Sequence, residues 1–173
     1  MEERGCKRYE SLYSNLGGLN VLDIYIDADA CPVKEEVYRV AERYGLNVTL
    51  VSNSRMRVPA GPRIRLEVVS DGFDAADNWI VEHVARFDIV ITADIPLASR
   101  CLKQGALVIG TSGKPFTEAN IGQVVATRDL LADLRVAGEV TGGPRPITQR
   151  DRSQFLQSLD AAIQTVKRKP RTV

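Results

Sequence analysis

Several aspartates stand where a folded chain could bring their carboxylates together. They are Asp27, Asp29, Asp74, Asp77 and Asp94. Asp74 and Asp77 lie three residues apart in a helical pattern and so share one helix face, whereas the others follow apolar runs. Carboxylates at close range cannot all stay ionised unless a cation neutralises them. Oxygen ligands without His or Cys suit Mg²⁺ or Mn²⁺, and one or two such ions suit phosphodiester hydrolysis.

Each of these acids except Asp27 also has a structural interpretation. Asp74 is placed to cap the N-terminus of a helix, with Asp77 as a favourable acid in its first turn. Asp29 and Asp94 each precede a helix that opens with proline, where an acid stabilises the positive end of the helix dipole. Asp27 has no such explanation, because an acid at a strand end beside another acid costs free energy without a ligand. Asp27 is therefore the acid that most strongly favours a metal site.

Basic side chains gather in two stretches, although the whole chain is nearly neutral, with 23 Lys and Arg against 22 Asp and Glu. Residues 53–65 contain four arginines and no acid, and residues 150–173 carry six basic side chains against two acidic ones. Such patches beside an acidic centre fit an enzyme that holds a polyanion, and solvated surface charge is the structural alternative. The residues expected to contact nucleic acid, RNA in particular, are Asn53, Ser54, Arg55, Arg57 and Arg152.

The elements that must position these side chains follow from hydrophobic periodicity and from turn residues. We expect strands over residues 21–27, 47–52, 64–69, 88–92 and 106–109, and helices over residues 32–44, 75–86, 96–105, 127–136 and 148–166. After residue 110 only helical patterns are expected. Strands that alternate with helices predict a single three-layer α/β domain, in which helices cover both faces of a mostly parallel sheet of about five strands. Ligands of such sheets bind beyond the carboxyl ends of the strands, where the acids stand.

Length and composition limit the class of protein. The 173 residues, 44% of them hydrophobic, suit one compact domain with its own core. The chain lacks an apolar run of the roughly 18–20 residues that cross a bilayer, so we expect no membrane partner. Cys6, Cys31 and Cys101 form no zinc or disulfide pattern, which favours the reducing cytoplasm. Cys31 lies near a predicted helix start, but the chain offers no partners for a nucleophile, and packing is the favoured interpretation.

Domain boundaries are expected only near the ends of the chain. Residues 1–20 are polar and of mixed charge, have no secretory h-region, and read as a poorly ordered extension. Residues 21–166 form the α/β domain, and residues 167–173 form a basic tail. The apolar faces of the predicted helices could serve a core or an interface, so homo-oligomerisation stays open.

The chain resembles the YaiI/YqxD family of bacterial proteins, whose fold is PIN-like. The resemblance covers residues 21–168 and is carried by several long motifs in order. They are IYIDADACPVK (24–34), NSRMRVP (53–59), GFDAADNWI (72–80), DIVITADIPLA (88–98), TGGP (141–144) and the DRxxF segment from residue 151.

This resemblance implies a chemistry. PIN-like domains are Mg²⁺- or Mn²⁺-dependent nucleases whose acids end the first and fourth strands and start an intervening helix. Matched by motif, that role falls on Asp27, on Asp74 or Asp77, and on Asp94, with Asp29 as a further candidate.

Three functions compete at this point. A metal-dependent nuclease would use Asp27 and Asp94 as ligands, and Asp29 would order water. A phosphatase of the haloacid dehalogenase type would use Asp27 as nucleophile and Asp29 as general acid, but the Lys that such enzymes need is not evident. A non-catalytic module would bind RNA or a partner protein, with the acids as helix caps. The nuclease is the favoured interpretation, and the sequence leaves open whether the chain is an enzyme.

Overall fold

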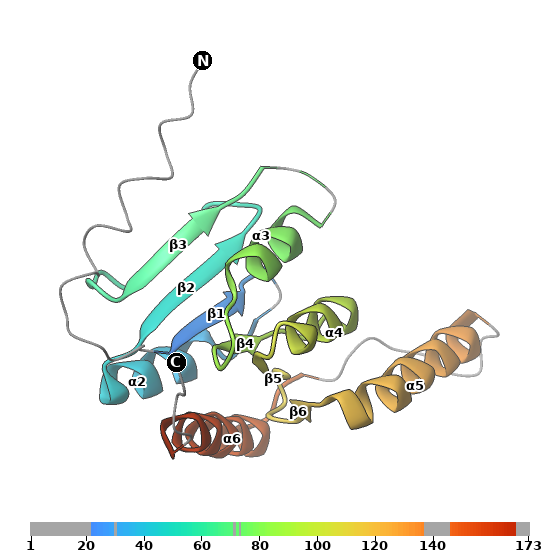
Figure 1. Cartoon of the computed structure of the whole chain (residues 1–173). Helices are drawn as coiled ribbons and strands as arrows, with labels where there is room; N and C mark the ends of the chain where they lie inside the picture. Colours follow the sequence, from blue (N-terminus) through green and yellow to red (C-terminus); the bar gives the residue numbers. More distant parts are fainter. Residues whose placement is uncertain (1–21, 30, 71, 73, 137–145, 169–173) are drawn as a thin grey trace.

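The structure is a computed structural model that describes residues 22–29, 31–70, 72, 74–136 and 146–168. At its centre is a six-stranded sheet with the strand order β3-β2-β1-β4-β5-β6 (Figure 1). The strands are β1 (Asp23–Asp27), β2 (Asn47–Ser52), β3 (Ile64–Val68), β4 (Ile89–Ile91), β5 (Leu107–Ile109) and β6 (Pro115–Phe116). The helices are α2 (Lys34–Tyr44), α3 (Ala75–His83), α4 (Ile95–Lys103), α5 (Glu118–Val136) and α6 (Gln149–Arg168). Strands β1 to β5 are parallel, and β6 pairs antiparallel with β5.

Two helices cover each face of the sheet. Alternate residues of a strand point to opposite faces, so Ile24 and Ile26 pack with α2 and α6, whereas Tyr25 packs with α3 and α4. The inner strands are therefore buried on both sides, which is why their sequences are almost continuously apolar. The three-layer α/β architecture that the sequence predicts is confirmed (Figure 1).

The C-terminal helix α6 packs on the face of the sheet opposite α3 and α4. Its residues Phe155, Leu159 and Ile163 are fully buried in the core that α2 shares. The helix continues to Arg168, so the first residues of the predicted basic tail are helical. The predicted extension over residues 1–20, the TGGP motif and residues 169–173 lie outside the described residues.

The expectation that only helices follow residue 110 is wrong. The chain turns back at Gly113, whose φ is 83°, and hydrogen bonds from Gly113 N–H to the Gly110 carbonyl and from Gly110 N–H to the Lys114 carbonyl, both 2.8 Å, let β6 pair with β5. A strand of two residues has no periodicity of its own, so pairing alone defines it.

Helix α5 also begins earlier than the predicted 127–136 segment. Thr117 and Asn120 cap its start reciprocally, since each backbone N–H donates to the other's side-chain oxygen at 2.9 and 3.2 Å. Most of α5 is exposed, including Leu130 at 59% and Val136 at 91%. In the described part of the chain, no helix combines the length and the apolar character that a membrane span requires.

Candidate active site at the switch point of the sheet

The strand order reverses between β1 and β4. Within the sheet, β2 and β3 lie on one side of β1, whereas β4, β5 and β6 lie on the other. In open parallel sheets the loops diverge at such a point and leave a crevice beyond the carboxyl ends of the strands. Asp27 ends β1, and its neighbour Ile26 is in register with Ile91 at the end of β4. The topology therefore places Asp27 beside the segment that leads to Asp94.

Thr92 joins the two acids through hydrogen bonds. Its hydroxyl donates to Asp27 Oδ2 at 2.8 Å and accepts from Asp94 N–H at 2.9 Å. Thr92 is buried, so this chain of bonds is shielded from competing water. Sequence reasoning did not single out Thr92. Thr92 directly follows β4, and because Ile26 pairs with Ile91, it lies opposite Asp27. The pairing of β1 with β4 would therefore have identified it.

Asp94 begins α4 and is in part a helix cap. Its Oδ1 accepts the Leu97 N–H at 2.8 Å, and its backbone is extended, as at other N-caps. The structural interpretation of Asp94 therefore holds for one carboxylate oxygen. Among the described residues no hydrogen bond to Oδ2 is present.

Asp74 and Asp77 enter from the start of α3. Asp74 has a φ of 58°, and its exposed side chain accepts no capping hydrogen bond, so the capping interpretation does not explain this residue. A non-glycine residue in this conformation is uncommon and costs free energy. Asp77 lies in the first turn of α3 and is half-buried.

Asp29 is anchored to the neighbouring strand β2. Its Oδ1 accepts from the Ser52 hydroxyl at 2.5 Å, and its Oδ2 accepts from the Asn53 N–H at 3.1 Å. Ser52 is fully buried and ends β2, so it fixes Asp29 at the carboxyl edge of the sheet, on the far side of Asp27 from β4. The sequence analysis did not identify Ser52, because only the sheet order brings it to Asp29.

Burial and the charges of nearby acids shift the pKa of two members of this group. Burial raises the pKa of Asp27 above 3.8, the hydrogen bond from Thr92 lowers it, and the charges of Asp29 and Asp94 raise it further. Burial also raises the pKa of Asp77 to about 6, together with the charges of Asp94, Asp27 and Asp74. The fold therefore confines several carboxylates here, and protonation or a bound cation would offset their repulsion.

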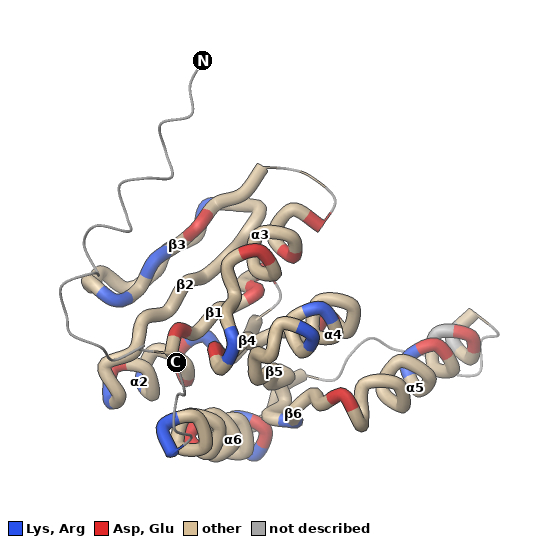
Figure 2. Tube along the Cα trace, in the orientation of Figure 1, with Lys and Arg blue, Asp and Glu red and all other residues tan. Residues whose placement is uncertain are grey.

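One cation borders the acids from α4. The charge of Arg100 opposes the raised pKa of Asp77, and its Nη2 donates to Asn78 Oδ1 at 2.8 Å. Figure 2 shows the acidic positions at the start of α3 and the basic positions of the adjoining α4. Arg100 was not predicted, because it lies late in α4 and reaches the acids only through the packing of α4 on α3.

The donor set agrees in kind with a hard divalent cation. All the candidate ligands are carboxylates, and the raised pKa values indicate a site that would gain from a positive charge. Within the described residues, however, no group of three or more His, Cys, Asp and Glu is close enough to hold a metal ion between them. Mg²⁺ keeps several waters and needs only one or two direct carboxylate ligands, so it is the kind of ion that such a donor set could accept.

The residues expected to contact nucleic acid separate into two groups. Asn53, Ser54, Arg55 and Arg57 are exposed on the segment that leaves the end of β2 beside Asp29. They are accessible to a ligand.

Arg152 is bound within the protein, and its contact with nucleic acid stays a prediction. Its Nη1 donates to both carboxylate oxygens of Glu36 at 2.9 Å and to the Pro32 carbonyl at 3.0 Å. The Glu36 side chain is only 4% exposed, so Arg152 compensates a buried charge and joins α6 to α2.

The two described cysteines are not nucleophiles. Burial raises the pKa of Cys31 to about 11 and that of Cys101 to about 12, so both thiols stay protonated near neutral pH. This agrees with the packing interpretation of Cys31.

Fold and site together define a three-layer α/β protein with a group of carboxylates at the switch point of its sheet. The family model described as "Uncharacterized BCR, YaiI/YqxD family" matches residues 25–165. The chain belongs to the YaiI/YqxD family, as its motifs predict.

Relatives from several bacteria are similar over nearly their whole length. A UPF0178 protein of Nitrobacter winogradskyi is 55% identical over 87% of this chain and 96% of its own length. One from Rhodopseudomonas palustris strain TIE-1 is 58% identical over 84% of this chain and 92% of its own. A third, from Azorhizobium caulinodans, is 56% identical over 85% of this chain and 92% of its own. No solved structure matches the chain significantly.

Proposed function

We propose that this protein hydrolyses phosphodiester bonds with the aid of Mg²⁺ or Mn²⁺, and that its substrate is RNA rather than DNA. The observation that carries the proposal is the raised pKa of Asp27 and Asp77 at the switch point. Acids with perturbed pKa values in a crevice are typical of functional sites, because folding gains nothing from confining their charge. The resemblance to PIN-like nucleases supports the same residues.

Asp27 and Asp94 are the residues that would hold the ion directly, whereas Asp77 and Asp74 at the start of α3 would bind its water molecules. When bound, a divalent ion would acidify a water molecule and stabilise negative charge on the phosphate. Thr92 positions Asp27 through the hydroxyl that donates to Oδ2.

Further groups would bind and orient the substrate. Arg100, held by its bond to Asn78, would offset the charge of the phosphate beside Asp77. Asp29 would order water near Asp27. The exposed side chains of the segment after β2 would contact the nucleic-acid backbone, and they are Asn53, Ser54, Arg55 and Arg57.

The test is cleavage of a labelled RNA pool and a labelled single-stranded DNA pool in the presence of Mn²⁺ or Mg²⁺. We expect cleavage of RNA that EDTA abolishes, and at least about a hundredfold loss in Asp27→Asn and in Asp94→Asn, since each removes a charged ligand. Asp129→Asn, which changes an exposed aspartate of α5, is the matched control and should cleave normally. Cleavage that survives EDTA or both site variants would overturn the proposal.

A binding module without catalysis is the second candidate, and the capping bond of Asp94 favours it. Its signature is salt-sensitive RNA binding that both site variants retain, without cleavage in any metal. The phosphatase is not proposed, since both oxygens of Asp29 are already bound within the protein, to the Ser52 hydroxyl and the Asn53 N–H. Self-association stays a prediction, which sedimentation velocity would check.

A further inference from the structure

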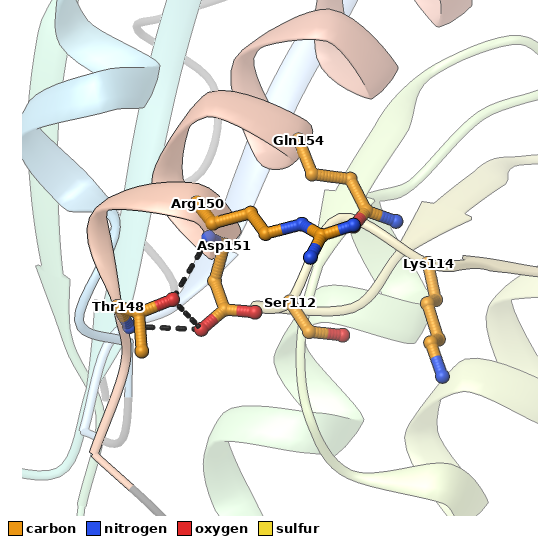
Figure 3. Close-up of a pocket in the computed structure, with 6 residues that line it drawn as sticks. All are labelled: Ser112, Lys114, Thr148, Arg150, Asp151 and Gln154. Atoms are coloured by element: carbon orange, nitrogen blue, oxygen red, sulfur yellow. Dashed lines mark hydrogen bonds between the residues drawn. The ribbon is translucent and has the colours of Figure 1, made fainter.

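A hollow lies at the carboxyl edge of the sheet, apart from the carboxylate group. It has a volume of about 580 Å³ and opens between the loop that joins β5 to β6 and the first turns of α6. Its lining consists almost entirely of polar and charged side chains (Figure 3), which are Ser112, Lys114, Thr148, Arg150, Asp151 and Gln154.

Two cations from different elements border this hollow. Lys114 comes from the β5–β6 loop and Arg150 from the first turn of α6, and both side chains are exposed. Within the described residues, neither of them forms an ion pair. Unpaired cations around a hollow attract an anion, because nothing in the protein already neutralises them.

The one acid in the lining, Asp151, is hydrogen-bonded to Thr148 at the start of α6. Asp151 Oδ2 accepts from the Thr148 N–H at 2.8 Å and from the Thr148 hydroxyl at 2.6 Å, and the Asp151 N–H donates back to that hydroxyl at 3.2 Å. This is a capping box, and Asp151 is buried. The lining therefore keeps a net charge of +1, from Lys114 and Arg150 against Asp151.

Close packing holds the two cationic walls in fixed relation. Gly113 precedes Lys114, and a Cβ on it would lie 2.7 Å from the Phe155 backbone nitrogen of α6. Only glycine permits this approach, and its φ of 83° also favours glycine. The loop thus rests directly on the α6 backbone, which fixes the backbone beside Lys114 relative to the first turns of α6, and both Lys114 and Arg150 line the hollow.

A neighbouring hollow extends from this one to the start of α4. An adjoining hollow of about 500 Å³ shares Ser112 and Lys114 and extends to Ile95, the residue after Asp94. The loop leaves β5 at the same edge, where Thr92 N–H donates to the Ile109 carbonyl at 3.3 Å. A strand of nucleic acid that crosses the carboxylates could therefore reach Lys114 and Arg150 along the surface.

We propose that the hollow of Lys114 and Arg150 binds a backbone phosphate of the polynucleotide whose cleavage is proposed above, and so the inference rests on that proposed function. The ligand is a phosphodiester, recognised by the two cations, with the Ser112 hydroxyl and the Gln154 amide as further donors. The site reads the backbone and not the bases, so it contributes affinity and register, without sequence preference.

The test measures binding of a fluorescent oligoribonucleotide by anisotropy in EDTA, where no metal-dependent cleavage occurs. Lys114→Gln combined with Arg150→Gln should weaken binding about tenfold near 50 mM salt and lower the salt slope by about one to two. The control combines Arg43→Gln with Lys103→Gln, which removes the same charge from exposed last-turn positions of α2 and α4. The control should bind like the wild type. Equal binding by both double variants, with unchanged circular dichroism, would overturn the inference.

Two further experiments distinguish polynucleotide phosphate from free phosphate as the ligand, and the phosphate site from the proposed nuclease activity. Inorganic phosphate at about 10 mM and constant ionic strength should leave the wild-type affinity within about twofold, and stronger displacement would show a site for free phosphate instead. Asp27→Asn should keep the Lys114- and Arg150-dependent binding. If the wild type shows Lys114- and Arg150-dependent binding but cleaves no RNA with Mn²⁺, the phosphate site is supported and the nuclease proposal is refuted. If the wild type cleaves RNA while the Lys114 and Arg150 double variant binds normally, the nuclease proposal is supported and the phosphate site is refuted.

Discussion

Replacing Asp77 with asparagine should stabilise the metal-free protein at neutral pH. Folding raises the pKa of Asp77 from 3.8 to about 6, so the folded state binds this proton more tightly than the unfolded state. The stability of the wild type therefore decreases as the pH rises from about 4 to about 6, and the penalty is complete above that range. The full shift corresponds to roughly 3 kcal/mol. Partial solvation reduces it to about 1–2 kcal/mol, and the lost first-turn interaction with the α3 dipole takes back about 0.5 kcal/mol, which leaves a net gain of about 1 kcal/mol.

The assay is urea unfolding in EDTA over a range of pH. Asp77→Asn should exceed the wild type by about 1 kcal/mol at about pH 7.5, and the difference should shrink toward zero at about pH 3, where the carboxyl is largely protonated in both states. Asp129→Asn, on the exposed face of α5, should differ by less than about 0.5 kcal/mol at every pH. A gain that is the same at both pH values, or a variant less stable than the wild type at about pH 7.5, would refute the reasoning. Added Mg²⁺ tests the metal separately, since it should stabilise the wild type more than the variant.

The remaining predictions concern the packing that supports the site, and urea unfolding checks both. Arg152→Ala should cost about 2–3 kcal/mol because it leaves the buried Glu36 charge with only the longer, exposed ion pair to Arg39. Arg39→Ala should cost under about 0.5 kcal/mol, since Arg39 is 68% exposed and 3.5 Å from the same carboxylate. Similar costs would refute the role of Arg152. Gly113→Ala should cost about 3 kcal/mol because its Cβ would meet the α6 backbone at 2.7 Å, whereas Gly122→Ala, which faces open space in α5, should gain about 0.5–1 kcal/mol, and a neutral Gly113→Ala would contradict the close contact.

Elements with a strong periodic pattern were predictable to within a few residues. The strand over residues 47–52 was predicted with the bounds of β2, and the helix stopped by Gly45 ends at Tyr44. Gly45 has a φ of 65°, which explains why it ends the helix. The start of α5 and the short β6 were missed because a reciprocal cap and a strand pairing define them, and neither produces a hydrophobic period.

The candidate site was predictable only in part. The sequence places Asp27 at a strand end and Asp94 just before a helix, and both positions hold. Thr92 and Ser52 were missed, because a buried hydroxyl in an apolar strand shows no partner until the neighbouring strand is known. Arg152 was expected to contact nucleic acid because it lies in a basic stretch. Its hydrogen bond to Glu36 was not foreseen, since Glu36 lies on another helix.

By itself the sequence determined the α/β class, the family, and the acids that follow its strands, because periodicity, turn residues and motifs are local properties of the chain. The tertiary structure alone decided that β1 lies beside β4, that the charges of Asp27 and Arg100 act on Asp77, and that Lys114 lines the same hollow as Arg150. These are contacts between elements far apart in the chain. They depend on the order of the strands and the packing of helices on the sheet, and so on which buried surfaces fit one another.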